Sequence, residues 1–147
     1  MTPGARVQAA IDCLDRILSG QPAEQVLTNW ARNSRYAGSG DRAAVRDHVY
    51  GALRRRRSAA WVGGAETARG LMIGALILDG QDPGAFFTGM GHAPAPLEAG
   101  EGQGRIDEAS AAVRADLPDW LYARFADDLG ERALPVAEAL KSRAPVW

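Results

Sequence analysis

Residues 65–78 read AETARGLMIGALIL, and apolar side chains fill almost every position in the second half of this run. A helix at the surface carries its apolar residues on one stripe, whereas a helix that is apolar on all sides is buried. The segment Leu71–Leu78 fits the second pattern. We therefore predict a central helix over residues 65–78, against which the other elements pack.

Helical periodicity also marks the chain on both sides of this run. Apolar residues recur every three or four positions, and no stretch shows a convincing two-residue alternation. Thr2 and Pro3 suit the start of a first helix, and Ser39 with Asp41 suits the start of a third. The sequence predicts an all-α bundle of about six or seven helices. Besides the central one, the expected helices cover residues 2–20, 22–33, 40–57, 106–113, 120–129 and 135–143.

Residues 80–104 interrupt this helical pattern. They contain the run Ala93–Pro96 and many glycines, which favour turns and prevent regular helix. Pro83 is expected to open one short turn that carries Phe86 and Phe87 to the core. The remainder is predicted to be an irregular surface loop.

Residue types that serve catalysis and metal binding are few. The two histidines, His48 and His92, match no zinc-site spacing, and the chain has no phosphate loop or dinucleotide motif. Cys13 lies in an apolar stretch, which predicts a small buried thiol in a reducing, cytoplasmic environment. No run approaches the roughly 18 apolar residues of a membrane span. We expect no catalytic, cofactor-binding or metal-binding residue in this chain, and no membrane partner.

Basic residues are concentrated in the first half of the chain. The formal net charge is −1, but residues 1–69 hold 11 arginines and 6 acidic residues, whereas the rest hold 6 basic and 12 acidic residues. Arginine binds phosphate through two parallel hydrogen bonds, so this asymmetry points to an RNA-binding surface. The candidate RNA contacts are Arg32, Arg35, Tyr36, Arg42, Arg46, Arg54, Arg55, Arg56 and Arg57.

Two interpretations of this arginine-rich segment remain open. An RNA-binding surface combines phosphate contacts with aromatic rings that stack on unpaired bases, and Trp30, Tyr36 and Tyr50 are interleaved with the arginines. Arg54 could equally be a buried arginine that caps neighbouring helix ends. The alternative for the group is that its members are solvated or pair with nearby acidic residues, namely Asp12, Asp41 and Asp47.

A set of motifs spans nearly the whole chain: Ser39–Arg42, Val45 with Arg46, Tyr50–Arg54, Leu117–Arg124 and Arg143–Trp147. Together they resemble the front part of the bacterial rRNA cytosine-C5 methyltransferases, of the Sun/Fmu or small-subunit methyltransferase B type within the NOL/NOP/Sun group. In that family an all-helical NusB-like domain precedes a Rossmann-like methyltransferase domain. The resemblance implies a NusB-like RNA-binding domain over residues 1–142, with residues 143–147 starting a linker or strand into an absent methyltransferase domain.

The resemblance also implies a function. The complete protein would use S-adenosylmethionine to methylate a cytosine of small-subunit rRNA, with a cysteine nucleophile. The family places its cofactor loop and Pro-Cys motif in the absent part, and Cys13 matches neither, so no catalytic residue or cofactor is assigned to this chain. Residues 80–104 depart from the more regular helix of the family. The implied role is an accessory domain that orients small-subunit rRNA for its own methyltransferase domain.

Two other functions remain open for such a domain. One is an interdomain or protein-interaction scaffold with little affinity for RNA. The other is a free-standing RNA-binding factor of the antitermination type. RNA binding predicts an affinity that falls steeply with salt, whereas a scaffold predicts exposed apolar residues near Trp120 and Tyr122.

Overall fold

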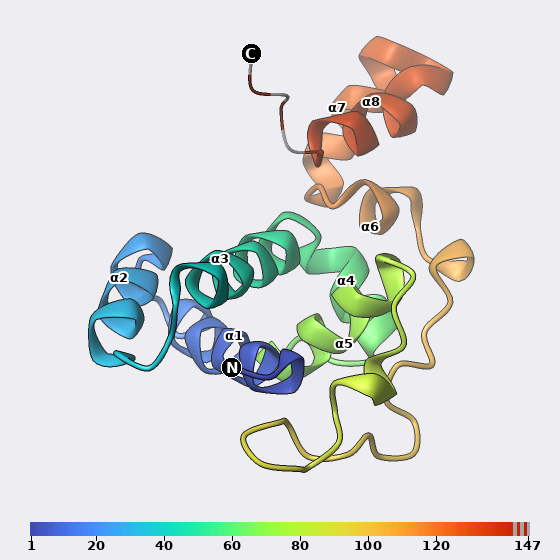
Figure 1. Ribbon diagram of the computed structural model, residues 1–147. Coiled ribbons are helices and arrows are strands. Elements are labelled where there is room, and N and C mark those ends of the chain that lie inside the picture. The colour runs from blue at the N-terminus through green and yellow to red at the C-terminus, as the bar shows by residue number, and fades with distance from the viewer. Residues whose placement is uncertain (143, 145, 147) are drawn as a thin grey trace.

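In the computed structural model, which describes residues 1–142, Ala144 and Val146, the helix α5 (Ala68–Leu78) lies inside a bundle of helices (Figure 1). Every residue from Gly70 to Leu76 is buried. The helix packs against α1 (Pro3–Leu18), α3 (Ser39–Arg54) and α4 (Arg56–Gly63). The predicted central helix is therefore confirmed. It begins three residues later than expected, because the hydroxyl of Thr67 caps it by accepting a hydrogen bond from the Gly70 amide at 3.0 Å.

The described residues form seven helices of eight or more residues, and no strand is found among them. The all-α prediction is confirmed. None of these helices is long and apolar enough to cross a bilayer. Arg143, Pro145 and Trp147 lie outside the described residues, and most of the predicted linker at 143–147 lies with them. The elements not yet introduced are α2 (Ala23–Asn33), α6 (Ala111–Ala115), α7 (Asp119–Leu129), α8 (Ala133–Leu140), and the 3-10 turns η1 (Pro83–Ala85), η2 (Ile106–Glu108) and η3 (Gly130–Arg132).

The arginine run does not end the third helix as the sequence pattern suggested. The helix breaks at Arg55, and α4 continues from Arg56 as a separate, shorter helix that the sequence analysis missed. The helix α4 buries Ala59 and Val62, which form a short apolar stripe. The stripe is hard to recognise in the sequence because arginines precede it. The start of α3 also differs by one residue, since Gly38 is the N-cap and its amide donates to the carboxylate of Asp41 at 3.0 Å.

The contact between α4 and α5 is the most extensive between any two helices of the described residues. Glycines allow the two backbones to touch. A Cβ added to Gly74 would overlap the carbonyl oxygen of Ala59 and lie 2.8 Å from its Cα. A Cβ added to Gly63 would overlap the carbonyl oxygen of Gly70. The pairing of these helices therefore depends on the absence of side chains at the crossing.

The predicted small buried thiol of Cys13 is confirmed. The side chain is 1% exposed and belongs to a core to which all of the first five helices contribute. Burial disfavours the thiolate and raises the pKa of Cys13 to about 11.

The last three α-helices lie together at one end of the molecule, beyond α4 (Figure 1). They join the rest of the bundle through α6, which packs on α4. At this joint the Asp116 side chain, 3% exposed, accepts hydrogen bonds from the Ser58 amide and hydroxyl, both at 2.7 Å. It also accepts from Lys141 Nζ at 2.8 Å. One buried carboxylate thus links α4, the end of α6 and the end of α8.

The loop over residues 80–104 is irregular, as predicted, apart from the short turn η1. Phe87 is 2% exposed, so the expected delivery of this ring to the core is confirmed. The loop is fastened to α5 by Arg69, which bonds both oxygens of Glu101 at 2.8 and 2.9 Å. Arg69 also donates to the carbonyl oxygens of Ala95 and Pro96 and lies over the Phe87 ring. A single guanidinium therefore orders much of the loop.

The contact between Arg69 and Glu101 predicts a stability change in acid. Hydrogen bonds from Arg69, and then from the Glu98 amide, lower the pKa of Glu101 from 4.5 to about 2. Because the folded state holds the carboxylate, this stabilisation is fully present above pH 4.5 and is lost as the pH falls toward 2. We expect Glu101→Gln to be less stable than the wild type at pH 7 in urea unfolding, with a difference that disappears near pH 2. Glu98→Gln, an equal charge change on an exposed neighbour, is the control, and a constant Glu101→Gln difference at all pH values would contradict the assignment.

Candidate nucleic-acid interface

The predicted RNA contacts follow α3 and surround both of its ends. One group lies at the end of α2 and in the turn before α3, and another joins α3 to α4. A helix rises about 1.5 Å per residue, so Arg42 and Arg54 are separated by roughly 18 Å along α3. The structure therefore distributes these side chains along α3 and the segments next to its two ends. The start of α3 is near Arg32, Arg35, Tyr36 and Arg42, its middle holds Arg46, and its end is near Arg54, Arg55, Arg56 and Arg57.

Arg46 is engaged by an acidic residue of α2. Its guanidinium bonds Glu24 Oε1 at 2.7 Å, and the hydroxyl of Tyr50 donates to the same oxygen. The Tyr50 hydrogen bond, followed by that of Arg46, lowers the pKa of Glu24, so the carboxylate stays charged at neutral pH. This cluster joins α2 to α3 and partly neutralises Arg46 as a phosphate ligand.

Two other candidate residues have structural contacts of their own. Arg55 forms an ion pair with Asp79 at 3.0 Å. Arg57 donates to the carbonyl oxygen of Leu117 at 2.6 Å and to Asp119 at 2.9 Å, which ties α4 to the start of α7. The role of capping a neighbouring element, considered above for Arg54, therefore belongs to Arg57.

Five arginines remain exposed, and no ion pair to any of them occurs in the part of the chain that the structure describes. Two of the three acidic residues considered as their partners are engaged elsewhere. Asp41 bonds Arg6 at 2.8 Å and the Gly38 amide, contacts that hold its pKa below the usual range, with the Gly38 bond the larger cause. Asp12 accepts from Gln8 at 2.8 Å. We call these five residues the arginine surface: Arg32, Arg35, Arg42, Arg54 and Arg56.

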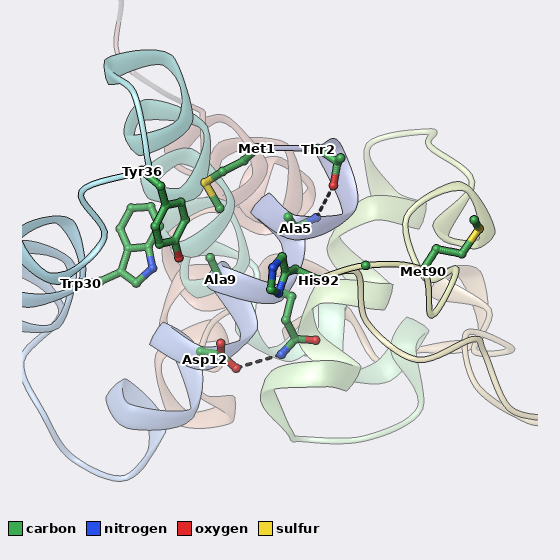
Figure 2. Close-up of a pocket in the computed structure, with 11 residues that line it drawn as sticks. Met1, Thr2, Ala5, Ala9, Asp12, Trp30, Tyr36, Met90 and His92 are labelled. Atoms are coloured by element: carbon green, nitrogen blue, oxygen red, sulfur yellow. Dashed lines mark hydrogen bonds between the residues drawn. The ribbon is translucent and has the colours of Figure 1, made fainter.

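A groove of about 780 Å³ opens beside the α2 end of the arginine surface. Figure 2 shows Trp30 and Tyr36 on one side and His92 near the middle, close to Ala5 and Ala9 of α1, with Met90 farther away. Tyr36 is 73% exposed, so its ring forms the rim rather than the floor. We call this feature the aromatic groove. Its lining is completed by Met1, Thr2, Gln8, Asp12 and Gly91.

Three separate segments build the aromatic groove. Trp30 is on α2, and Tyr36 lies in the turn closed by the hydrogen bond from the Ala37 amide to the Ser34 carbonyl oxygen. The opposite wall is a tight turn of the Gly/Pro loop, in which the Ala93 amide donates to the Met90 carbonyl oxygen at 3.0 Å. Gly91 has a φ of 58° in this turn, a conformation that favours glycine. The sequence analysis singled out Tyr36 as a contact but not Met90 or His92, because nothing in the sequence places that loop next to α1.

The described residues contain no group of three or more His, Cys, Asp or Glu side chains arranged to hold a metal ion. Comparisons of the chain with known protein families, curated proteins and solved structures find no match.

Proposed function

We propose that this chain is an RNA-binding accessory domain of the NusB-like type. In this proposal it belongs to an S-adenosylmethionine-dependent rRNA cytosine-C5 methyltransferase and orients small-subunit rRNA for a separate catalytic domain. The arginine surface carries the proposal. Five exposed guanidinium groups without an ion pair in the described chain, spread along one helix and its ends, suit a phosphate backbone.

Electrostatics within the fold support the same function. Two acidic residues close to these arginines in the fold form contacts that do not involve the arginine surface, since Glu24 bonds Arg46 and Asp41 bonds Arg6. Charge that is not neutralised within the protein is available to displace counterions from RNA. The aromatic groove adds rings at the edge of this surface, as single-stranded RNA binding requires.

The test is fluorescence anisotropy with small-subunit rRNA hairpins at several salt concentrations. Arg35→Glu with Arg42→Glu reverses two charges of the arginine surface, and we expect affinity to fall at least tenfold. If each arginine neutralises one phosphate, the slope of log affinity against log salt should decrease by about 1.4 for single-stranded RNA. Unchanged helicity by circular dichroism checks that the fold is retained.

The matched control is Arg124→Glu with Arg132→Glu, which changes net charge equally on α7 and η3. RNA binding through the arginine surface requires the control to bind with near wild-type affinity. Equal losses in both double variants would indicate a general charge effect. Absence of salt-dependent binding by the wild type would remove RNA binding as the function.

A protein-interaction scaffold is the second candidate, and the C-terminal helices favour it. No residue of α7 is buried, and Trp120 and Leu140 are 67% and 68% exposed. Exposed apolar side chains of this size gathered on neighbouring helices are typical of a surface that packs on another protein or domain.

Trp120 provides the test of that surface. Because its ring is mostly exposed, we expect Trp120→Ala to change the melting temperature by less than about 2 °C. Truncation of a buried tryptophan would instead lower the free energy of unfolding by about 3–5 kcal/mol. Differential scanning fluorimetry checks this expectation. A large fall in melting temperature would show that the ring supports the fold and would leave the scaffold without its main contact residue.

A further inference from the structure

We propose that the aromatic groove binds one unpaired nucleobase of the RNA, and that it selects a base carrying an exocyclic amino group. The inference rests on the proposed RNA-binding function and adds to it a site and a base preference. It is argued from the shape of the groove, the polar groups within it and the charges around it.

The shape suits a flat aromatic ligand. Trp30 and Tyr36 form one wall and the imidazole of His92 lies on the other, while the floor between them consists of small side chains, Ala5 and Ala9 (Figure 2). Unpaired bases stack on such rings, and alanines leave the space that the base edge enters. The volume of about 780 Å³ is ample for one base and its ribose.

The polar groups favour a hydrogen-bond donor on the ligand. Asp12 Oδ1 accepts from Gln8 Nε2 at 2.8 Å, which fixes the carboxylate at the groove. No hydrogen bond to Asp12 Oδ2 occurs within the described residues, so this oxygen is available to accept from an amino group. Carboxylates read the amino group of cytosine in this way. Uracil presents a carbonyl oxygen at the same position and would be repelled by Asp12.

The charges in and around the groove favour a nucleotide whose base lies inside the groove and whose phosphates lie outside it. A negative carboxylate inside the groove disfavours a phosphate there. Arg32 and Arg35 lie between Trp30 and Tyr36 in the chain and are not part of the groove lining. A nucleotide can therefore place its base against the aromatic rings and its phosphates on the arginine surface. A peptide has no phosphate groups to place on the arginine surface, so it fits this arrangement of charges less well than a nucleotide does.

The experiment compares labelled RNA decamers of cytidine, of uridine, and of abasic ribose phosphate, which carry the same phosphates. We expect the wild type to bind the cytidine decamer roughly 2- to 12-fold more tightly than the uridine decamer. Tyr36→Ala, at an exposed position that leaves the fold intact, should weaken binding of the cytidine decamer roughly 5- to 160-fold, while Tyr36→Phe should retain affinity. Asp12→Asn should abolish the difference between cytidine and uridine.

The outcomes separate this site from the proposed function. Salt-dependent binding with equal affinity for all three decamers, unaffected by Tyr36→Ala, would overturn the base site and leave RNA binding through the arginine surface in place. An absence of salt-dependent binding to any decamer would remove RNA binding itself. A cytidine preference that persists in Asp12→Asn would overturn the assigned role of the carboxylate.

Discussion

Gly74→Ala is expected to destabilise the protein by about 3 kcal/mol or more, which corresponds to a fall in melting temperature of about 6–12 °C. The added methyl group would overlap the carbonyl oxygen of Ala59 and lie 2.8 Å from its Cα. Both are backbone atoms of α4, which cannot move aside as the end of a flexible side chain can. The most extensive helix contact of the bundle must therefore widen along its length. Urea and thermal unfolding monitored by circular dichroism measure the loss.

Gly40→Ala is the matched control. Gly40 lies in the first turn of α3, and no atom is found within 4 Å of a Cβ added there. Alanine at such a helical position is neutral or stabilises by about 0.4–1 kcal/mol. Similar unfolding curves for the two variants would show that the backbones of α4 and α5 do not approach each other as described.

Asp116→Ala is expected to lower the free energy of unfolding by about 3–5 kcal/mol. Removing one partner of a buried ion pair leaves the charge of the other partner uncompensated. The Asp116 carboxylate is 3% exposed and bonds both the Ser58 backbone and Lys141. The backbone adds to the cost, since Asp116 has a φ of 57°, which alanine tolerates less well. We expect α6, α7 and α8 to detach first, and limited proteolysis followed by mass spectrometry should locate early cleavage there.

Asp119→Ala provides the comparison three residues further on. Its carboxylate pairs with Arg57 but is 83% exposed, so its removal should cost less than about 1 kcal/mol. Asp116→Asn keeps an acceptor for Ser58 and tolerates the left-handed backbone, and should fall between the two alanine variants. An Asp116→Ala protein as stable as Asp119→Ala would mean that the joint does not depend on this carboxylate.

The sequence predicted the parts of the fold that depend on local pattern. The all-apolar run around Leu71–Leu78 identified the central helix, and the helix expected over residues 120–129 corresponds to α7. It missed α4, because a helix of eight residues that begins with Arg56 and Arg57 has too short an apolar stripe to stand out. It also missed the attachment of the Gly/Pro loop, since Arg69 and Glu101 are 32 residues apart. Tertiary partners at such separations leave no periodic signal.

The candidate site could likewise be predicted only where it depends on local sequence. Composition and charge located an arginine-rich segment, but could not tell which guanidinium groups were engaged by distant partners such as Asp79 for Arg55. The opposite wall of the aromatic groove comes from a loop whose glycines and prolines predicted only irregular structure. His92 and Tyr36 are far apart in the sequence, and the fold of the intervening helices is what places them on one groove.

The only cysteine of the chain can report how often the core opens. Cys13 is 1% exposed, and with its pKa near 11 the thiol is both shielded and protonated in the native state. An alkylating reagent can therefore modify it only during moments when α1 separates from the core. Each molecule is marked at most once, so the fraction labelled over time gives the frequency of these openings in plain buffer. That frequency measures how long a single chain keeps its core closed, a property that equilibrium unfolding averages away.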